Sequence, residues 1–314
     1  MTETHTGVLA ERQAGTPRNA SNNATRTAAP SAWYAAPALI MFVGFAIVPL
    51  VIVAGLSFTD WDGLNAINFS GLTNWIKAFN DPQTYHSLGL TLQVMALSWI
   101  IQTPISLLLG VFTAGKQKYR AVYGVFFFIP LLISAAAIAI AFKSLLDPNF
   151  GLGQSLGVPW LSQNWLGDPN IVIYTVVFII AWQFVPFHAL LYQGGVRQIP
   201  ESLYEAATLD GAGRMAQFFN ITLPQLRNTI ITSSTLMLVG SLTYFDIVFV
   251  LTGGGPGTST RLLPLDMYLT GFSSYNMGLA SVLAVILVVL GLVLSLGLTK
   301  FSGFSKMSSE LEGA

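Results

Sequence analysis

The sequence predicts an all-α integral membrane protein with six transmembrane helices. Of its 314 residues, 53% are hydrophobic and only 9% are charged, whereas about 25% of the residues in an ordinary soluble domain are charged. Long uncharged stretches recur along the chain, and a helix needs about 20 apolar residues to cross a hydrocarbon core of about 30 Å. Together these observations exclude a chain built of soluble domains.

The composition also limits the possible functions. Lysine plus arginine and aspartate plus glutamate each total 14 residues, so the net charge gives no support for nucleic-acid binding, which usually requires a basic face. The absence of cysteine excludes disulfides, thiol catalysis and thiolate metal sites. Three histidines, His5, His86 and His188, are too widely spread to suggest a metal centre. We expect no catalytic residue, no metal and no cofactor.

Six stretches are long and apolar enough to form the predicted spans. If these stretches are helical, apolar residues occupy every face of each helix, whereas the helices of a soluble core keep a polar face. Only the fifth stretch contains a charged residue in its interior, Asp246. A polar segment, 270–276, precedes the last span and is expected at the interface or dipping into the protein. The transmembrane helices are expected near residues 33–58, 86–114, 121–143, 170–193, 227–252 and 278–300.

The positive charges predict the orientation and the outer limits of the membrane domain. If the N-terminus is cytoplasmic, eleven lysines and arginines lie inside and only three lie outside, namely Lys77, Lys143 and Arg261. Both termini are therefore expected in the cytoplasm. Residues 1–32 are polar and lack an apolar core, which is typical of a disordered tail rather than a signal peptide. The membrane domain is expected over residues 33–300, followed by a short cytoplasmic tail, 301–314.

The longest cytoplasmic loop, residues 193–226, is predicted to form a helix–turn–helix. Pro200 can open a short helix, and Ser202 with Glu205 three residues later has the form of a capping box. Gly211 can end this helix in a left-handed conformation. A second short helix is expected over residues 214–220, limited by the proline at position 224. The loop would lie across the cytoplasmic mouth of the membrane domain.

One motif in this loop identifies a family. Residues 205–224 match the pattern EAAxxDGAxxxxxFxxIxLP without a departure, which resembles the signature loop of ABC importer permeases in its carbohydrate-importer version. Residues 251–257 (LTGGGPG) and 147–151 (DPNFG) resemble the maltose-permease-like branch of that family. The resemblance covers roughly residues 33–300 and implies the ABC importer type I permease fold.

The resemblance also implies a function and a set of partners. The chain would be the membrane-spanning permease subunit of an ATP-driven sugar importer in the bacterial plasma membrane, and the expected sugar is an oligosaccharide. Its partners would be a second homologous permease, ATP-binding cassette ATPase subunits and an extracellular sugar-binding protein. ATP hydrolysis would occur in those partners, so the chain itself would not be an enzyme. The expected ATPase-coupling residues are Glu205, Ala206, Ala207, Asp210, Gly211 and Ala212.

Four residues are candidates for lining the path of the solute. Asp246 lies inside a predicted span, where an ionisable group is costly and usually faces a cavity or a partner. Sugars are bound by carboxylates and amides through their hydroxyl groups and by aromatic faces, which adds Tyr244, Gln183 and Trp182. Structural pairing of Asp246 with a neighbouring helix is the alternative, and packing in the membrane is the alternative for the other three.

Two other classes of function remain open at this point. An ion-coupled secondary transporter would need no ATPase, although such proteins often contain broken helices and several intramembrane ionisable groups. A membrane-embedded enzyme is disfavoured because no catalytic set of residues is found. Residues 110–117 approach the phosphate-binding loop GxxxxGK[ST]. However, Gln117 lacks the hydroxyl group that would bind magnesium, so the chain is expected to carry no ATPase of its own.

Overall fold

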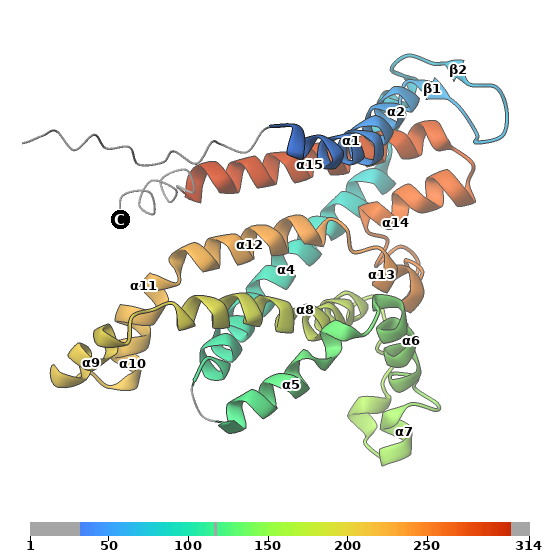
Figure 1. Cartoon of the computed structure of the whole chain (residues 1–314). Helices are drawn as coiled ribbons and strands as arrows, with labels where there is room; N and C mark the ends of the chain where they lie inside the picture. The colour runs from blue at the N-terminus through green and yellow to red at the C-terminus, as the bar shows by residue number, and fades with distance from the viewer. Residues whose placement is uncertain (1–31, 116–117, 303–314) are drawn as a thin grey trace, which may run out of the picture. The chain divides into compact units, whose positions relative to one another are not determined.

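A computed structural model of the protein describes residues 32–115 and 118–302. The regular secondary structure of the described part is helical apart from one short β-hairpin, in which β1 (Thr59–Asp60) pairs antiparallel with β2 (Asn68–Phe69) (Figure 1). The tails predicted over residues 1–32 and 301–314 lie outside the described residues, except for residue 32 and residues 301–302.

The N-terminal part of the chain is one run of helix. It begins with the 3₁₀-helix η1 (Ala32–Ala35) and continues through α1 (Ala36–Phe42), the π-helix η2 (Val43–Ile47) and α2 (Val48–Leu56). Its residues from Trp33 to Leu56 are long and apolar enough to cross a membrane. This run corresponds to the first predicted span.

After the β-hairpin formed by β1 and β2, the chain consists of helices of very different lengths. Three of them, α4, α8 and α15, are also long and apolar enough to cross a membrane. The helices are α3 (Thr73–Asn80), α4 (Pro82–Thr113), α5 (Lys118–Leu132), α6 (Ala135–Leu145), α7 (Leu152–Leu156), η3 (Pro159–Ser162), α8 (Val172–Arg197), α9 (Glu201–Leu209), α10 (Arg214–Gln217), η4 (Phe218–Thr222), α11 (Leu223–Gln225), α12 (Arg227–Ser241), α13 (Asp246–Leu251), α14 (Leu263–Tyr268), η5 (Leu269–Ser273) and α15 (Met277–Ser302).

The three long helices confirm the second, fourth and sixth predicted spans. Helix α4 begins at Pro82 rather than near residue 86, because Asp81 caps it by accepting a hydrogen bond from the backbone N–H of Gln83. A capping aspartate followed by proline at the first helical position is a strong start signal. The polar segment 270–276 forms most of the π-helix η5 and the irregular residues after it, where Tyr275 has a positive φ of 52°.

The third predicted span, 121–143, is bent rather than straight. Helices α5 and α6 meet at an angle of 97°, so they make a fifth candidate span only if the bent pair crosses the membrane together. The bend occurs because Ser134 adopts an extended conformation, and its Oγ accepts a hydrogen bond from the N–H of Ala137 to start α6. A serine at this position therefore acts as a helix cap.

The fifth predicted span, 227–252, was wrong as a single helix. The structure divides it into α12 and α13, separated by a four-residue break, 242–245. The N–H of Thr243 donates a hydrogen bond to the carbonyl of Gly240, and the Thr243 hydroxyl group donates to the same carbonyl at 2.7 Å. This side-chain bond competes with the helical pattern, so α12 ends and Asp246 opens a new helix.

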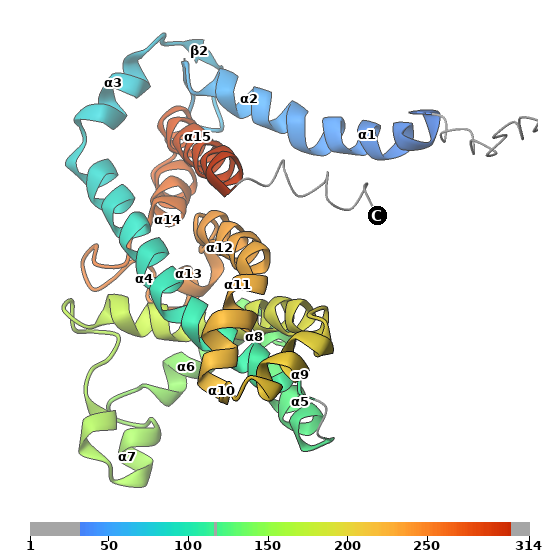
Figure 2. The ribbon, with the colours of Figure 1, turned by 90° about the vertical axis from the view of Figure 1, so that its left-hand side faces the viewer.

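The hydrophobic core of this region is formed mainly by buried residues of α4, α6, α8 and α13. Helix α4 packs against both α8 and α12 (Figures 1 and 2). On α8, the buried residues include Val176, Val177, Ile179 and Ile180, none of which is accessible to solvent. The face that α4 buries is mostly small or polar. It consists of Thr84, Ser87, Thr91, Val94, Ser98, Gln102, Ser106, Gly110 and Thr113.

Gly110 sets how closely α4 approaches α8. A Cβ atom at this position would lie 2.6 Å from the Cβ of Tyr192 and 2.7 Å from the carbonyl oxygen of Ala189. Small residues at such contacts let membrane helices come together, because there is no hydrophobic force between helices in lipid. Nearby, the Gln193 side chain donates to the carbonyl of Thr113 at 3.0 Å, which fixes the same ends of the two helices.

We predict that Gly110→Ala destabilises the protein, because the added methyl group forces α4 and α8 apart. Overpacking of this kind costs about 1–3 kcal/mol, so the midpoint of thermal unfolding in detergent should fall. Gly89→Ala, on the same helix with nothing within 4 Å of the added atom, is the matched control and should leave the midpoint unchanged or raise it. Equal effects of the two substitutions would contradict the close contact.

Candidate functional site

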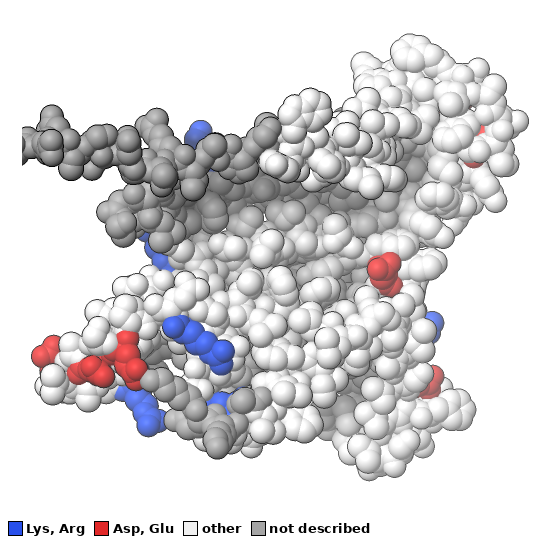
Figure 3. Space-filling view, viewed as in Figure 1, with Lys and Arg blue, Asp and Glu red and all other residues white. Residues whose placement is uncertain are grey.

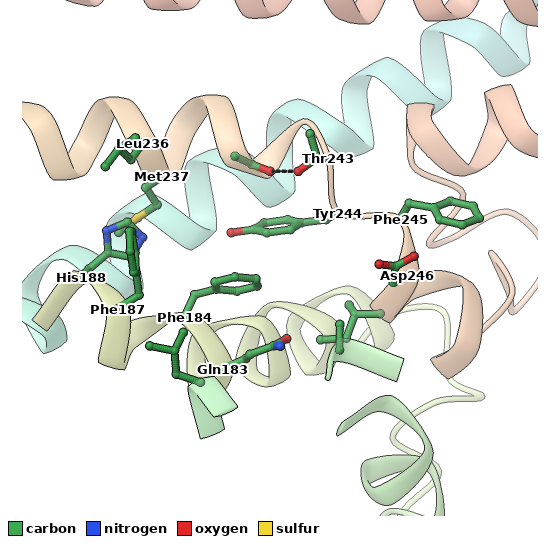
Figure 4. A pocket seen from close by; sticks show the side chains of 14 residues that line it. Gln183, Phe184, Phe187, His188, Leu236, Met237, Thr243, Tyr244, Phe245 and Asp246 are labelled. Carbon is green, nitrogen blue, oxygen red and sulfur yellow. Dashed lines mark hydrogen bonds between the residues drawn. The ribbon is translucent and has the colours of Figure 1, made fainter. Parts of the chain in front are cut away.

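A cavity of about 410 Å³ opens between α8, α12 and the break that follows α12 (Figure 4). Its volume lies within the range of roughly 300–1,000 Å³ that is typical of small-molecule sites. The lining residues are Leu131, Ala135, Gln183, Phe184, Phe187, His188, Leu236, Met237, Gly240, Thr243, Tyr244, Phe245, Asp246 and Ile247.

One face of α8 supplies four of the lining side chains. Gln183, Phe184, Phe187 and His188 are spaced so that they recur on one side of a helix. His188 is buried, and its Nδ1 lies 2.9 Å from the Oγ of Ser233 on α12. This hydrogen bond joins the two helices that form the sides of the cavity.

The break after α12 supplies the opposite wall. Tyr244 lies within the break and its ring packs on that of Phe184, with 5.6 Å between the ring centroids. Asp246 follows at the first residue of α13 and is exposed. In Figure 4, His188 and Asp246 lie at opposite ends of the cavity. The arrangement combines aromatic faces, an amide and a carboxylate in one concave surface.

The structure brings together three of the four residues that were expected to line a path. Gln183, Tyr244 and Asp246 border the same cavity, although they come from two different parts of the chain. Trp182 does not line it. Its ring instead packs edge-on against Phe142, with 5.3 Å between the centroids. Among the described residues Asp246 forms no ion pair, which disfavours structural pairing within this chain.

Several lining residues were missed from the sequence. Phe184, Phe187 and His188 could have been found from the helical periodicity of α8, because they share the face of Gln183. Thr243 and Phe245 could not have been found in that way, because their positions depend on the break.

The loop beyond α13 is fixed to the start of α4. Two nitrogens of Arg261 contact a single oxygen of Asp266, its Oδ1, with Nε at 2.8 Å and a terminal nitrogen at 2.7 Å. Burial raises the pKa of Asp266, and the charge of Arg261 opposes that rise. The N–H of Leu263 also donates to the Oγ1 of Thr91 on α4 at 2.8 Å. The loop after α13, which includes the glycine-rich residues 253–257, is therefore held by polar contacts.

The second candidate site is the loop 193–226, whose first helix is α9. The capping box expected at Ser202 and Glu205 is wrong. Helix α9 begins at Glu201 with Pro200 as its N-cap, and no side chain caps it. Helix α9 therefore begins two residues earlier than it would with Ser202 as its N-cap, and Ser202 lies inside the first turn.

The end of α9 confirms the prediction for Gly211, which has a φ of +78°. The N–H of Ala212 donates to the carbonyl of Ala207 at 2.8 Å, and the N–H of Gly211 donates to the carbonyl of Thr208 at 3.0 Å. These two bonds form a Schellman motif, which requires the left-handed conformation that glycine adopts most readily.

The second half of the loop is longer than expected. Helices α10, η4 and α11 form one run from Arg214 to Gln225, so Pro224 lies inside it. The π-helical turn over 218–222 directly precedes α11, and Pro224 is tolerated at the start of α11, where a missing N–H costs little. The hydroxyl of Tyr204 lies 2.9 Å from the Oγ1 of Thr222, which ties α9 to this run.

The expected coupling residues lie on the surface of this helical hairpin. Glu205, Ala206, Asp210 and Gly211 are exposed, and Ala207 and Ala212 are half-buried. Apolar side chains are exposed beside them, with Leu209 90% and Met215 70% accessible. Figure 3 shows that acidic and basic side chains gather at this end of the molecule over α9 and α10. The hairpin therefore exposes both charged and apolar groups on its surface.

Comparison with known proteins places this geometry in a family. Residues 102–302 match the family described as "Binding-protein-dependent transport system inner membrane component". The chain is 35% identical to the probable ABC transporter permease protein YurN of Bacillus subtilis, over 84% of this chain and 93% of that protein. It is 33% identical to the multiple sugar-binding transport system permease protein MsmF of Streptococcus mutans, over 81% and 89% of the two chains.

The fold is also similar to that of a solved transporter. A chain of the bacterial alginate ABC transporter, crystallised in complex with an alginate pentasaccharide-bound periplasmic protein, superposes with a TM-score of 0.76. The superposition covers 87% of this chain and 94% of that chain at 22% identity, so it is evidence for the fold alone. The match over residues 102–302 and the two relatives above show that this multi-pass membrane protein belongs to the binding-protein-dependent transport system inner membrane component family.

Proposed function

We propose that this chain is the membrane-spanning permease subunit of an ATP-driven importer for a sugar of the oligosaccharide class. The family is a membrane translocation component rather than a catalytic subunit. Relatives include transport permeases named for multiple sugars, for arabinooligosaccharides and for trehalose and maltose, which supports a sugar as the solute. The observation that carries the proposal is the exposed hairpin whose residues 205–224 carry the family motif.

The partners would be a second, homologous permease, ATP-binding cassette ATPase subunits inside the cell and an extracellular sugar-binding protein. The hairpin would dock on an ATPase subunit. Glu205 and Asp210 supply charge, and the small side chains of Ala206, Ala207 and Ala212 permit close approach to the partner. A short helix can bind a partner by placing the apolar residues of one of its faces in a groove.

The chain contains a direct mechanical route from the hairpin to the cavity. Helix α11 is separated from α12 by Leu226, which is 1% exposed and lies against α8 near Gly195. Helix α12 then ends at the break that contains Tyr244. A displacement of the hairpin by the ATPase would therefore move α12 against α8 and change the walls of the cavity. Alternating access of the cavity to the two sides of the membrane would follow.

Solute would bind in the cavity through hydroxyl groups and through the apolar side of its rings. The Asp246 carboxylate can accept hydroxyl hydrogen bonds, and the Gln183 Oε1, which has no partner among the described residues, can accept another. Phe184 and Tyr244 offer aromatic faces. A concave surface of this kind, mostly apolar with a few polar groups, is typical of a small-molecule site.

The proposed topology has six spans and both termini in the cytoplasm of a bacterial cell. The spans would be the N-terminal run ending with α2, then α4, the bent pair α5 and α6, α8, the broken pair α12 and α13, and α15. The distribution of eleven positive charges inside against three outside supports this orientation. Broken helices occur in transporters where the irregular backbone lines a cavity.

For the hairpin, we predict that Gly211→Pro weakens recovery of the ATPase subunit about tenfold, equivalent to about 1.4 kcal/mol, while membrane insertion stays normal. Proline fixes φ near −65° and removes the N–H that bonds to Thr208. Gly213→Pro is the control, because Gly213 already has a φ of −70°. Glu205→Lys should also lower recovery by reversing a contact charge. Affinity purification of the assembled complex measures the recovery of the ATPase subunit. Normal recovery with both Gly211→Pro and Glu205→Lys would rule out docking through this hairpin.

For the cavity, we predict that Asp246→Asn raises the KM of uptake about tenfold while the complex still assembles. A hydrogen bond to a charged group contributes about 1.5–3 kcal/mol, and the substitution removes the charge at constant size. Uptake of a radiolabelled sugar chosen by thermal-shift screening of the sugar-binding protein provides the measurement. Asp60→Asn, an exposed residue of β1, is the control. Loss of the whole complex from the membrane in Asp246→Asn alone would point to a structural role.

A further inference from the structure

The buried face of α4 is polar, and most of its polar groups have partners. Ser106 donates to the carbonyl of Val185 on α8 at 3.1 Å. Thr91 accepts a hydrogen bond from the N–H of Leu263. Next to this face, the Trp99 ring nitrogen donates to Ser234 on α12 at 2.9 Å. These contacts explain why hydroxyl groups occur on the inner side of a membrane helix.

Gln102 is different, although it lies on the same face. It is 0% exposed, and neither its Nε2 nor its Oε1 has a hydrogen-bond partner among the described residues. One turn earlier, Ser98 is also 0% exposed and its hydroxyl group is also without a partner there. An unpaired amide in a membrane core is costly, and such groups in native proteins call for an explanation.

The neighbour of Gln102 connects it with the cavity. The next residue of α4, Thr103, places its Oγ1 3.9 Å from the sulfur of Met237, which lines the cavity. The Tyr244 hydroxyl group lies beside the Gln102 amide, but the two groups form no hydrogen bond. The ring of the same tyrosine borders the cavity, where it packs on Phe184. Tyr244 therefore lies between the amide of Gln102 and the space where solute is proposed to bind.

Tyr244 is held by a weak part of the backbone. It lies in the break after α12, where its N–H donates to the carbonyl of Ser241 at 3.4 Å. The N–H of Phe245 donates to the carbonyl of Thr243. No regular helical ladder passes through these residues. The tyrosine can therefore turn away from α4 without unwinding a helix.

We propose that Gln102 is a second binding position for the hydroxyl groups of the solute, and that Tyr244 covers it in this conformation. The inference rests on the proposed function, since it needs a polyhydroxylated solute in the cavity. When Tyr244 turns away, the Gln102 Oε1 can accept one hydroxyl hydrogen bond and its Nε2 can donate two. Ser98, one turn away, adds a hydroxyl group on the same face. The amide is then unpaired only in the conformation without solute.

Cysteine accessibility tests this proposal without knowledge of the sugar, because the native chain has no cysteine. Gln102→Cys would be assembled with its ATPase partners in proteoliposomes and treated with the small thiol reagent 2-aminoethyl methanethiosulfonate. The reaction should be slow in the resting complex and at least about tenfold faster after trapping with ATP and vanadate. Ser106→Cys, which faces the backbone of α8, should react slowly in both states. Equal, slow reaction of Cys at position 102 in both states would overturn the proposal.

Two further variants separate the proposed role from a structural one. Adding Tyr244→Ala to Gln102→Cys should make labelling fast even in the resting complex, because the covering ring is removed. Gln102→Leu should leave the midpoint of thermal unfolding unchanged or raise it, because an unpaired polar group is replaced by an apolar one. A clearly lower midpoint would mean that the amide is held by structural water, and would overturn the proposal. Failure of the ATPase to co-purify with the unmodified chain would instead show that the importer assignment itself has failed.

Discussion

The close contact between α4 and α8 is the constraint on which the rest of the structure depends. Lipid provides no hydrophobic force between helices, so the two helices must be held by close packing at Gly110 and by polar contacts such as that from Ser106 to the α8 backbone. With α8 fixed from one side, its face bearing Gln183 and His188 is free to form the wall of a cavity. The face of α8 that packs against α4 and the face that lines the cavity are thus two faces of one helix.

The break between α12 and α13 connects packing with function. If residues 227–252 formed one helix, Tyr244 and Asp246 would follow helical spacing and would not face the cavity together with Phe184. The other end of α12 is joined through Leu226 to the hairpin that carries the family motif. One helix therefore links the surface proposed to bind an ATPase with the wall of the proposed solute site. A coupling of this kind needs an element with two arrangements, and we propose that the break is that element.

The sequence predicted the structure well where residue type or hydrophobic pattern determines it. It was misleading where a hydrogen bond from one side chain to the backbone determines it. Uncharged runs identified the long spans, and the left-handed turn at Gly211 follows from the residue itself. The bend at Ser134 and the break at Thr243 arise because single hydroxyl groups capture backbone groups inside apolar runs, which no hydrophobic pattern reveals. Trp182 was chosen by residue type, but successive side chains on a helix point about 100° apart, so Gln183 faces the cavity and Trp182 does not.

We propose that this chain moves solute only when an ATPase drives it, and not as an ion-coupled transporter. The chain would be reconstituted with its permease, ATPase and binding-protein partners, and uptake of a radiolabelled sugar retained by the binding protein would be measured in proteoliposomes. Uptake should require ATP on the ATPase side, stop with vanadate and persist when a protonophore abolishes the proton gradient. Uptake that follows an imposed proton or sodium gradient without ATP would contradict the account.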